Sequence, residues 1–408
     1  MTVIDTETRA ALEELRDAGA HRLHIAATGA AAGLQGILWS VPGCSALFGG
    51  ASFPYAQAET DALLGFSPGQ YASRSTAVDL AIAAFMKVAS SASTRAPVGV
   101  GIAASVTSLE DHRGDHRVHV AVFGEGIARV STMVLRKGGD DARRRDGEAC
   151  DLFALGEIMA ALAVPMSYES HPAARVRAAA STFGLADPIE AQALFTERLM
   201  ANPLVLACGQ RRPVTDITSL GPYSLLLHPG TFDPPHEGHI TGSRAAFDVF
   251  VAESASRRPS TVRRLVHTIT IDPPNKPKLT TAIALRRALA LGKQGCDTLL
   301  SAGDPLFVDK AQRFPNACFV VGADTVIRML DPQWGPSPED VMDALMRAGA
   351  CLYVIGREVT NVQGKTDFVT LKHPWIQTKI PDGYGFIFRH VPGRWDVSSS
   401  AIRAAKSQ

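Results

Sequence analysis

The sequence predicts an α/β protein with a Rossmann-like parallel sheet in its C-terminal half. Short apolar runs typical of buried strands alternate there with longer stretches of helical periodicity. This rhythm favours a parallel sheet whose strands are joined by right-handed crossover helices. A Gly/Pro loop with two histidines follows the first run, and the 408 residues exceed one typical domain. We therefore expect two or three folded parts.

The strand-like runs of this half are rich in branched and aromatic residues. They lie at residues 223–227, 265–271, 318–321, 351–355 and 384–388. Helical candidates lie between them, at residues 240–252, 280–291 and 338–348. We assign residues 216–408 to this domain and expect its ligand cleft at the carboxyl ends of the strands.

The rest of the chain divides into an N-terminal α/β domain, residues 1–165, and a helical bridge, residues 166–215. Alanine-rich stretches at 173–180 and 188–200 predict helices in the bridge, and Gly/Ser repeats typical of flexible linkers are absent. The uncharged stretch 25–58 is long enough to span a bilayer, but glutamine, proline and glycine interrupt it, so we interpret it as a buried helix and loop. The charged run 137–146 predicts a solvated turn before a helix.

Composition excludes several classes of partner. The charged fraction is 20% and the net charge is +1, which gives no electrostatic footprint for nucleic acid or an anionic membrane. The N-terminus lacks a basic segment followed by an apolar core, so we expect a cytoplasmic protein without a signal peptide. The cysteines contain no CxxC pair, which predicts reduced thiols and no zinc site. They are Cys44, Cys150, Cys208, Cys296, Cys318 and Cys351.

The first candidate site is the segment HisProGlyThrPheAspProProHisGluGlyHis, residues 228–239. Its histidines His236 and His239 are three residues apart at the expected start of a helix, where unpaired N–H groups and the dipole attract anions. Imidazoles on one face there can donate to phosphoryl oxygens. Gly230, Thr231 and Phe232 belong to the loop that would approach the nucleotide. The alternative interpretation is ordinary loop and helix-cap histidines.

A second candidate site lies near the C-terminus. Ser398, Ser399 and Ser400 are good N-cap residues, and Arg403 projects from the same face of the short helix that they would begin. Hydroxyls and a guanidinium would form a second phosphate clamp, unless the arginine is only a solvated helix charge. Asp324 ends the apolar run before it, so we expect a ribose or nucleotide contact, the alternative being a helix cap.

These two motifs resemble those of the nucleotidyltransferase superfamily that carries HxGH and (I/V)SSxxIR, with a HUP-type fold. The resemblance is closest to the nicotinate and nicotinamide mononucleotide adenylyltransferases. Further landmarks follow in the same order: ProProAsnLysPro at 273–277, the pair Arg286 and Arg287, ValValGlyAlaAsp at 320–324, and Trp334. The family's usual GlyGly is ProGly here, preceded by His228, which leaves the turn geometry and the acceptor open.

The resemblance implies that a mononucleotide phosphate attacks the α-phosphate of ATP and releases pyrophosphate, with Mg²⁺ sharing the charge. It implies that His236, His239 and Arg403 are catalytic and that Ser398 to Ser400, Gly230 to Phe232 and Asp324 bind the nucleotide. Lys276, Arg287 and Trp334 are the candidates for binding the acceptor. Each cation could equally be an exposed charge without a role, and the tryptophan could be a core residue.

Residues 15–165 resemble the CinA C-terminal family. The matching segments include LeuHisIleAlaAlaThrGly at 23–29, SerValProGlyCysSer at 40–45 and GlyIleAlaAlaSer at 101–105. Members include nicotinamide mononucleotide amidohydrolases with a serine nucleophile and a lysine. The positions matching these residues hold Thr28 and Thr60, and Ala27 stands in place of the family's glutamate.

A hydroxyl without a nearby base is a poor nucleophile, so we expect an inactive amidase site around Thr28, Tyr55, Thr60 and Ser105. The domain would then serve dimerisation or ligand sensing. The contrary hypothesis is that Thr28 acts with another base, such as His24 or Tyr55. A simpler structural interpretation is that Thr28 and Ser105 cap turns or helices.

Two functional hypotheses from different classes follow. The first is an ATP-dependent nucleotidyltransferase of pyridine nucleotide metabolism. The second is a binding protein that senses pyridine nucleotides without turnover. The complete set of His236, His239, Ser399 and Arg403 favours the enzyme, because a sensor has no need to hold a leaving pyrophosphate. Phosphopantetheine as acceptor, or CTP in place of ATP, stays open within the enzyme class.

Overall fold

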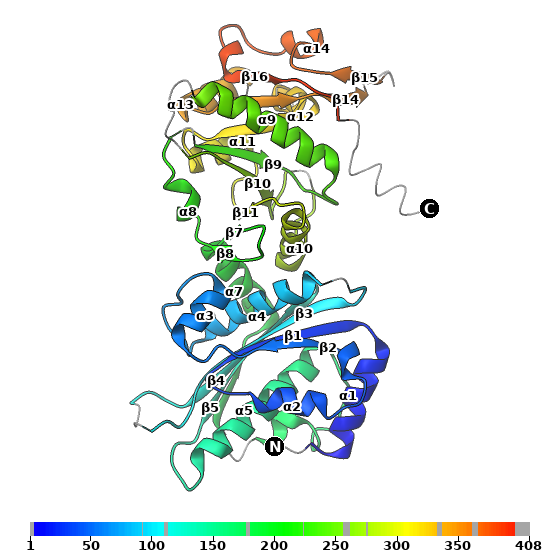
Figure 1. Cartoon of the computed structure of the whole chain (residues 1–408), viewed down its shortest axis with the longest axis vertical. Coiled ribbons are helices and arrows are strands. Elements are labelled where there is room, and N and C mark those ends of the chain that lie inside the picture. Colours follow the sequence, from blue (N-terminus) through cyan, green and yellow to red (C-terminus); the bar gives the residue numbers. More distant parts are fainter. Residues whose placement is uncertain are drawn as a thin grey trace. The chain divides into compact units, whose positions relative to one another are not determined.

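The computed structural model describes residues 4–91, 93–109, 113–176, 180–222, 224–255, 262–274, 276–332, 337–360 and 366–395. The chain forms two compact units, drawn in Figure 1. Unit 1 comprises Met1–Asn202, Gly209–Arg211 and Thr280–Arg286. Unit 2 comprises Pro203–Cys208, Arg212–Leu279 and Arg287–Gln408. Both contain helices and a sheet with parallel strands, which confirms the α/β class.

Unit 1 is built on a six-stranded sheet with the order β2-β1-β3-β4-β5-β6. Strand β1 pairs in parallel with β2 and β3, and the remaining neighbours are antiparallel. The strands are β1 (His21–Thr28), β2 (Phe48–Ser52), β3 (Ala96–Ser105), β4 (Arg117–Gly124), β5 (Ile127–Leu135) and β6 (Ala180–Leu185).

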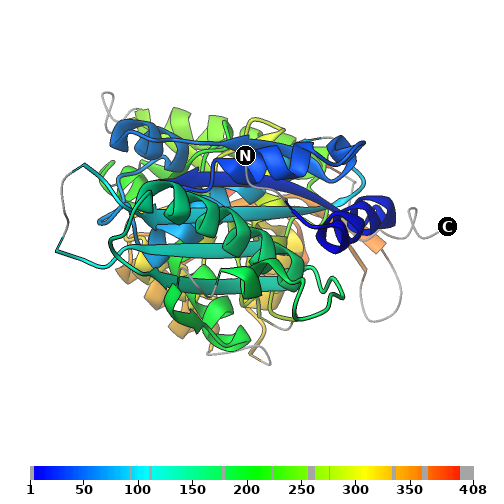
Figure 2. The ribbon, with the colours of Figure 1, turned by 90° about the horizontal axis from the view of Figure 1, so that it is seen from below.

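Helices cover both faces of this sheet, as Figures 1 and 2 show. Helices α4 (Arg74–Ala89) and α7 (Pro188–Ala201) lie on one face, and the other carries α1 (Thr6–Ala18), α2 (Gly33–Trp39) and α5 (Ala142–Ala161). The smaller helices of the unit are η1 (Cys44–Ala46), α3 (Gln57–Leu64) and α6 (Pro172–Arg175). Glycines of β3 let α4 approach closely: a Cβ on Gly99 or Gly101 would overlap the backbone oxygen of Ala81 or Ala77.

Unit 2 contains an eight-stranded sheet with the order β16-β13-β12-β9-β10-β11-β7-β8. Its strands from β16 to β11 are parallel to their neighbours, and β7 is antiparallel to β11. The strands are β7 (Leu204–Val205), β8 (Arg211–Arg212), β9 (Leu225–Pro229), β10 (Arg264–Thr270), β11 (Thr298–Ser301), β12 (Cys318–Gly322), β13 (Leu352–Ile355) and β16 (Phe388–Val391). The predicted Rossmann-like parallel sheet is confirmed.

Two apolar cores lie on the two faces of this sheet, because side chains alternate along each strand. Leu226 of β9 packs towards α9 (Glu237–Ala255), while Leu225 and Leu227 pack towards α12 (Ala323–Met329) and α13 (Pro338–Arg347). The remaining elements are α8 (Thr215–Thr218), α10 (Thr281–Gly292), α11 (Phe307–Arg313), α14 (Pro374–Gln377), η3 (Gly385–Ile387) and the hairpin β14 (Arg357–Thr360) with β15 (Thr366–Val369).

Several sequence expectations need correction. The run 384–388 was expected to be a strand, but Gly385–Ile387 form the short helix η3 and β16 begins only at Phe388. Strand β11 has only four residues and was not anticipated. The segment 25–58, expected to be a helix and loop, also contains the end of β1 and all of β2.

The segment 166–215, expected to be a helical bridge, contains α7 close to its predicted bounds, but also strands. Strand β6 begins at Ala180, where a helix was predicted, and completes the sheet of unit 1. It escapes a pattern search because five of its six residues are exposed, so no apolar alternation marks it. The boundaries predicted for the three parts stay predictions.

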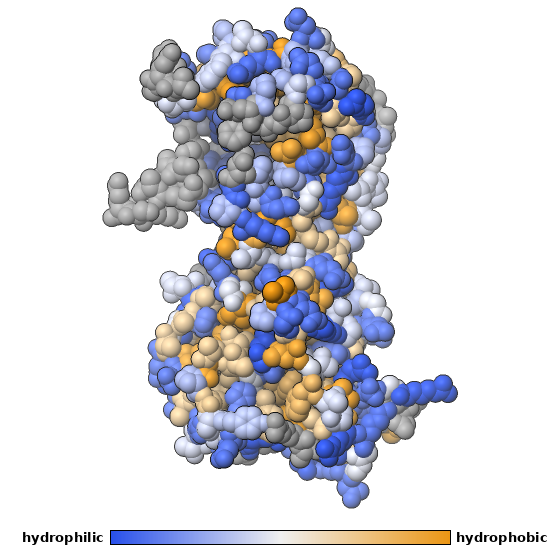
Figure 3. All heavy atoms as spheres, turned by 180° about the vertical axis from the view of Figure 1, so that it is seen from behind, coloured by the Kyte–Doolittle hydropathy of each residue, from blue (hydrophilic) through white to orange (hydrophobic). Residues whose placement is uncertain are grey.

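None of the helices in the described residues is long and apolar enough to cross a membrane. On the face drawn in Figure 3, hydrophilic and hydrophobic residues are interspersed over each unit. The six cysteines are free thiols, and Cys208 is the exposed one.

Candidate functional site

Unit 2 has a cleft of about 440 Å³ at the carboxyl ends of its parallel strands. Three groups of residues form its walls. The end of β9 and the start of α9 supply one, the residues after β12 and β13 a second, and the residues after β10 and β11 a third. The cleft is therefore where sheets of this kind bind ligands.

The two motif histidines meet inside this cleft. The rings of His236 and His239 stack with centroids 3.7 Å apart and planes 27° apart. The backbone N–H of His239 donates to the carbonyl of His236 at 2.9 Å, and helix α9 begins between the two residues, at Glu237. The three-residue spacing thus places both imidazoles at the helix start, as the sequence predicts.

Both histidines are neutral at physiological pH. Burial, with His236 and Arg357 nearby, lowers the pKa of His239 to about 3. Burial and Arg357 also lower the pKa of His236. The Nδ1 atom of His239 lies 3.4 Å from the backbone N–H of His236, which donates to it. The ring proton of His239 is therefore on Nε2.

Four other predicted residues line the cleft: Gly230, Thr231, Asp324 and Lys276. The backbone N–H of Gly230 donates to the Thr268 carbonyl at 3.0 Å, which ties the loop to β10. The carboxylate of Asp324 pairs with Arg328, one helical turn further on, at 2.6 Å. Asp324 therefore lies just after β12, and both it and its partner Arg328 line the cleft.

Two predicted residues lie beside the cleft instead. The ring of Phe232 is 1% exposed and packs edge-on against His228 and His239. It therefore restricts the positions of these two imidazoles. The guanidinium of Arg287 binds the Asp233 carboxylate at 2.8 Å and the Thr231 carbonyl at 3.0 Å. Arg287 therefore stabilises the loop that contains Thr231 and Asp233, and it does not line the cleft.

The second motif and the tryptophan lie outside the described residues. They are Ser398, Ser399, Ser400, Arg403 and Trp334.

Sequence reasoning missed four basic residues that line the cleft, of which Arg328 is the partner of Asp324 described above. His228 is the fourth residue of β9, Arg357 follows β13 after one glycine, and Lys310 lies in α11. The Lys310 ammonium donates to the Asp304 and Pro305 carbonyls, and burial lowers its pKa. Only Arg357 carried a usable signal, because it lies just after the carboxyl end of a predicted strand.

Among the residues that the structure describes, no group of three His, Cys, Asp or Glu side chains could hold a metal ion. The buried imidazoles of the cleft face each other, Phe232 and Arg357 rather than carboxylates.

The four residues of the predicted amidase site come from different segments of unit 1. Thr28 and Ser105 end the neighbouring strands β1 and β3, Thr60 donates its hydroxyl to the Ala56 carbonyl, and Tyr55 is 78% exposed. Among these four described residues no hydrogen bond joins one to another. The nearby His24 has its Nε2 3.2 Å from the Ser52 hydroxyl.

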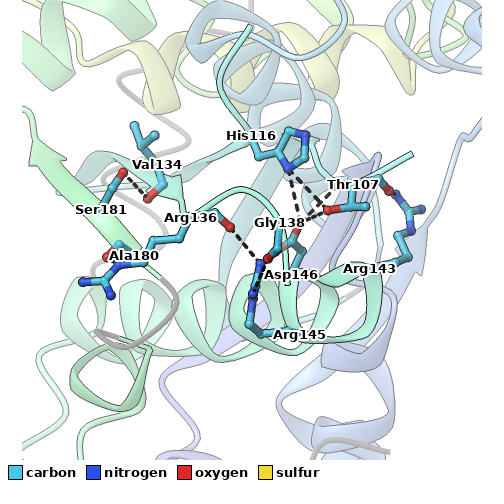
Figure 4. A network of polar contacts seen from close by, with 10 residues as sticks. All are labelled: Thr107, His116, Val134, Arg136, Gly138, Arg143, Arg145, Asp146, Ala180 and Ser181. Carbon is cyan, nitrogen blue, oxygen red and sulfur yellow. Dashed lines mark hydrogen bonds and ion pairs between the residues drawn. The ribbon is translucent and has the colours of Figure 1, made fainter. Parts of the chain in front are cut away.

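A buried polar network ties α5 to the β3–β4 connection of unit 1 (Figure 4). Asp146, which is fully buried, accepts from the backbone N–H and the hydroxyl of Thr107 at 3.1 and 2.7 Å. Arg145 donates to the same carboxylate at 3.1 Å, and His116 Nδ1 lies 3.5 Å from it. The run 137–146 was expected to be a solvated turn; its last residue instead anchors a helix, because this carboxylate satisfies buried donors.

The comparison with protein-family models gives no match, and the comparison with curated proteins gives none either. Several solved structures are similar to part of the chain. A competence-damaged protein (CinA) superfamily member from Enterobacter cloacae is 19% identical with a TM-score of 0.31, over 39% of this chain and 93% of its own. The protein CihA from Agrobacterium tumefaciens is 18% identical with a TM-score of 0.33, over 40% of this chain and 99% of its own. A CinA superfamily protein from Escherichia coli is 17% identical with a TM-score of 0.30, over 39% and 90%. No residue role is carried over from these proteins.

Proposed function

We propose that unit 2 is an ATP-dependent nucleotidyltransferase that transfers an adenylyl group to nicotinate or nicotinamide mononucleotide and releases pyrophosphate. The observation that carries this proposal is the pair of stacked, neutral imidazoles, His236 and His239, at the start of α9 inside a cleft at the carboxyl ends of parallel strands. Helix starts of this kind bind phosphate groups.

The reaction needs no covalent nucleophile from the protein. An oxygen of the acceptor phosphate forms a bond to the α-phosphorus, the bond from that phosphorus to its bridging oxygen breaks, and pyrophosphate leaves. Positioning and charge stabilisation supply the rate enhancement in such transfers. The Nε2–H of His239 would donate to a phosphoryl oxygen as negative charge moves towards the leaving group.

The basic side chains of the cleft could also stabilise negative charge on the phosphates. Arg357 is partly buried and close enough to His236 and His239 to lower both their pKa values. A guanidinium can bind two phosphoryl oxygens at once. Lys276 stands on the β10 side and would meet the acceptor phosphate, while Asp324 at the end of β12 would accept from a ribose hydroxyl.

Mg²⁺ would enter as part of the triphosphate substrate. This ion usually keeps several waters and binds mainly through substrate phosphates, so the protein need not supply a preformed metal site. Ser398 to Ser400 and Arg403 would bind the phosphates as a second group of donors. This part of the proposal rests on the sequence motif alone.

The first test supplies purified protein with ATP, Mg²⁺ and either mononucleotide, and follows pyrophosphate release and dinucleotide formation. We expect His239→Ala to lower the rate by about two to three orders of magnitude, as the loss of one transition-state donor typically does. His390→Ala, on β16 and outside the cleft lining, should keep the wild-type rate.

Wild-type protein that is inactive with both mononucleotides would refute this acceptor assignment. Turnover with a phosphopantetheine acceptor or with CTP would then redefine the substrates. ATP binding without any turnover would instead favour the sensor hypothesis.

Unit 1 is proposed to have no amidase activity through Thr28. The reason is chemical: none of the described hydrogen bonds connects its hydroxyl to a base that could activate it. Ammonia release from nicotinamide mononucleotide should stay at background in the same assay. Ammonia that disappears in Thr28→Val would contradict this expectation.

A further inference from the structure

His228 occupies an unusual position for a histidine. It is the fourth residue of the central strand β9, it is only 5% exposed, and it nevertheless lines the cleft. Its ring lies edge-on to Phe232 and His239, with centroids 5.3 and 6.1 Å away, and 5.2 Å from that of His267. The proposed function has not used this imidazole.

The two ring nitrogens of His228 have different surroundings. Nδ1 is fully buried and has no hydrogen-bond partner among the described residues. Nε2 also has no hydrogen-bond partner among the described residues but is not one of the fully buried atoms, so it lies on the edge by which the ring lines the cleft. Because Nδ1 has no partner among the described residues, the accessible Nε2 is the atom through which this imidazole can form a hydrogen bond, and its partner would be a ligand in the cleft.

The charge state of His228 follows from its neighbours. Burial, followed by His267, His239, Arg357 and His236, holds its pKa well below the usual range, so the ring is neutral. A neutral imidazole carries one proton. Because no described residue beside Nδ1 can accept that proton, it is better placed on Nε2, where a ligand can accept it.

The same reasoning applies to the motif histidines. His239 uses Nδ1 to accept from a backbone N–H, and Nδ1 of His236 is buried without a partner. All three rings therefore present Nε2–H groups as donors. Among the described residues, the nearby carboxylates already have cationic partners: Asp233 pairs with Arg287, Asp324 with Arg328 and Glu358 with Arg394. Donors without acceptors, next to the guanidinium of Arg357, indicate an anionic ligand rich in oxygen.

We propose that His228 is a third phosphate-binding imidazole of this cleft, whose Nε2–H donates to a phosphoryl oxygen of the triphosphate or of the pyrophosphate that leaves. The identity of the ligand rests on the proposed function, whereas the donor itself rests on the placement of the ring.

His267 provides a matched comparison. It stands opposite His228 in the register of β9 and β10 and is 1% exposed, but it does not line the cleft. Its Nε2 lies 3.2 Å from the hydroxyl of Ser243, which itself donates to the Ile240 carbonyl. His267 thus uses its Nε2 in a hydrogen bond to helix α9.

The test measures binding without turnover, by titration calorimetry of the full chain with inorganic pyrophosphate, with ATP and Mg²⁺, and with adenosine. His228→Phe keeps a ring and removes both nitrogens, so pyrophosphate and ATP should bind roughly 10- to 100-fold more weakly, the loss expected for one hydrogen bond to a charged group. Adenosine should bind as to wild type. His228→Gln, which returns an N–H near the Nε2 position, should recover part of the affinity, and His267→Phe should leave pyrophosphate binding unchanged.

The outcomes separate this inference from the proposed function. Folded His228→Phe that binds pyrophosphate as tightly as wild type overturns the inference, even if dinucleotide is formed. Equal losses for adenosine and pyrophosphate, or a failure of His228→Gln to recover any affinity, also overturn it, because they indicate a structural role. Selective loss of pyrophosphate binding supports it even if no mononucleotide is adenylated, and wild-type protein that binds neither pyrophosphate nor ATP refutes both proposals.

Discussion

Three imidazoles of the cleft share one neighbouring guanidinium. Arg357 lowers the pKa of His228, His236 and His239, although burial is the larger cause for each. Its Nη1 lies 3.4 Å from the Trp395 carbonyl, which it donates to, and its own pKa is lowered by burial. A partly desolvated cation with few partners is well suited to an incoming anion.

Arg357→Met should therefore change two measurable properties. The pKa of His239 should rise from its value of about 3, because a neighbouring positive charge is removed, but stay below the ordinary value because burial persists. ATP affinity should fall roughly 10- to 100-fold, since hydrogen bonds to charged groups are the strong ones. Nuclear magnetic resonance titration of the imidazole protons and calorimetry check these effects. Arg347→Met, at an exposed helix position, is the control; an unchanged His239 titration in Arg357→Met would contradict the expectation.

The sequence predicted those site residues that lie close together along the chain. His236 and His239 could be found because they lie three positions apart after a strand and loop. His228 could not, because one histidine inside an apolar run reads only as a strand residue. Arg357 joins the cleft because β13 lies two strands from β9 in the sheet, and strand order is not encoded in any local pattern.

At the scale of elements, the contact between α4 and β3 is the closest helix-to-sheet approach that glycine makes possible in unit 1. A Cβ at Gly99 would overlap the Ala81 carbonyl oxygen and would press on the Phe85 backbone. Neither neighbour is the flexible end of a side chain. Helix or strand backbone must shift to accommodate even one methyl group.

Gly99→Ala should consequently lower the free energy of unfolding by about 1–3 kcal/mol, the usual cost of overpacking. Urea denaturation followed by circular dichroism measures the change. Gly147→Ala is the matched control, because that helical glycine has open space around its Cβ position. It should stabilise by about 0.5–1 kcal/mol through helix propensity. Equal stabilities for Gly99→Ala and wild type would show that α4 can move away freely.

The elements themselves were predictable where they are long and periodic. Helix α13 matches its prediction to within one residue, whereas β11 and β6 were missed. Strand β11 is too short to show a period, and β6 is exposed because it is the edge of its sheet. Such strands form because a neighbouring strand offers hydrogen-bond partners, which is tertiary information.

For the molecule as a whole, the division into units depends on buried charge as well as on apolar cores. Asp79 of α4 is fully buried and pairs with Arg198 at 2.6 Å and with Arg211 at 3.2 Å. This binding places residues 209–211 in unit 1, although the chain has already entered unit 2 at Pro203. From the sequence, these residues were assigned only to a helical bridge, because the partner carboxylate lies more than 100 residues earlier.

Buried neutral histidines should set the acid limit of stability in both units. Burial lowers the pKa of His119 in unit 1 and of His267 in unit 2 to about 4. In the unfolded chain each titrates near about 6.5. Between these values the unfolded state binds a proton that the folded state excludes, so stability is complete above pH 6.5 and is lost as the pH falls towards 4.

Each of these histidines should contribute a slope of up to about 1.4 kcal/mol per pH unit across that window. Urea unfolding at pH values from 7 to 4.5 measures the slope, with far-ultraviolet circular dichroism for the whole chain and separate probes for the two units. His267→Phe should flatten the pH dependence of unit 2 and leave that of unit 1 unchanged, since His119 is untouched. An unfolding free energy of wild-type protein that stays constant down to pH 4.5 would mean that the folded protein admits these protons, and would remove the argument that the cleft histidines donate as neutral rings.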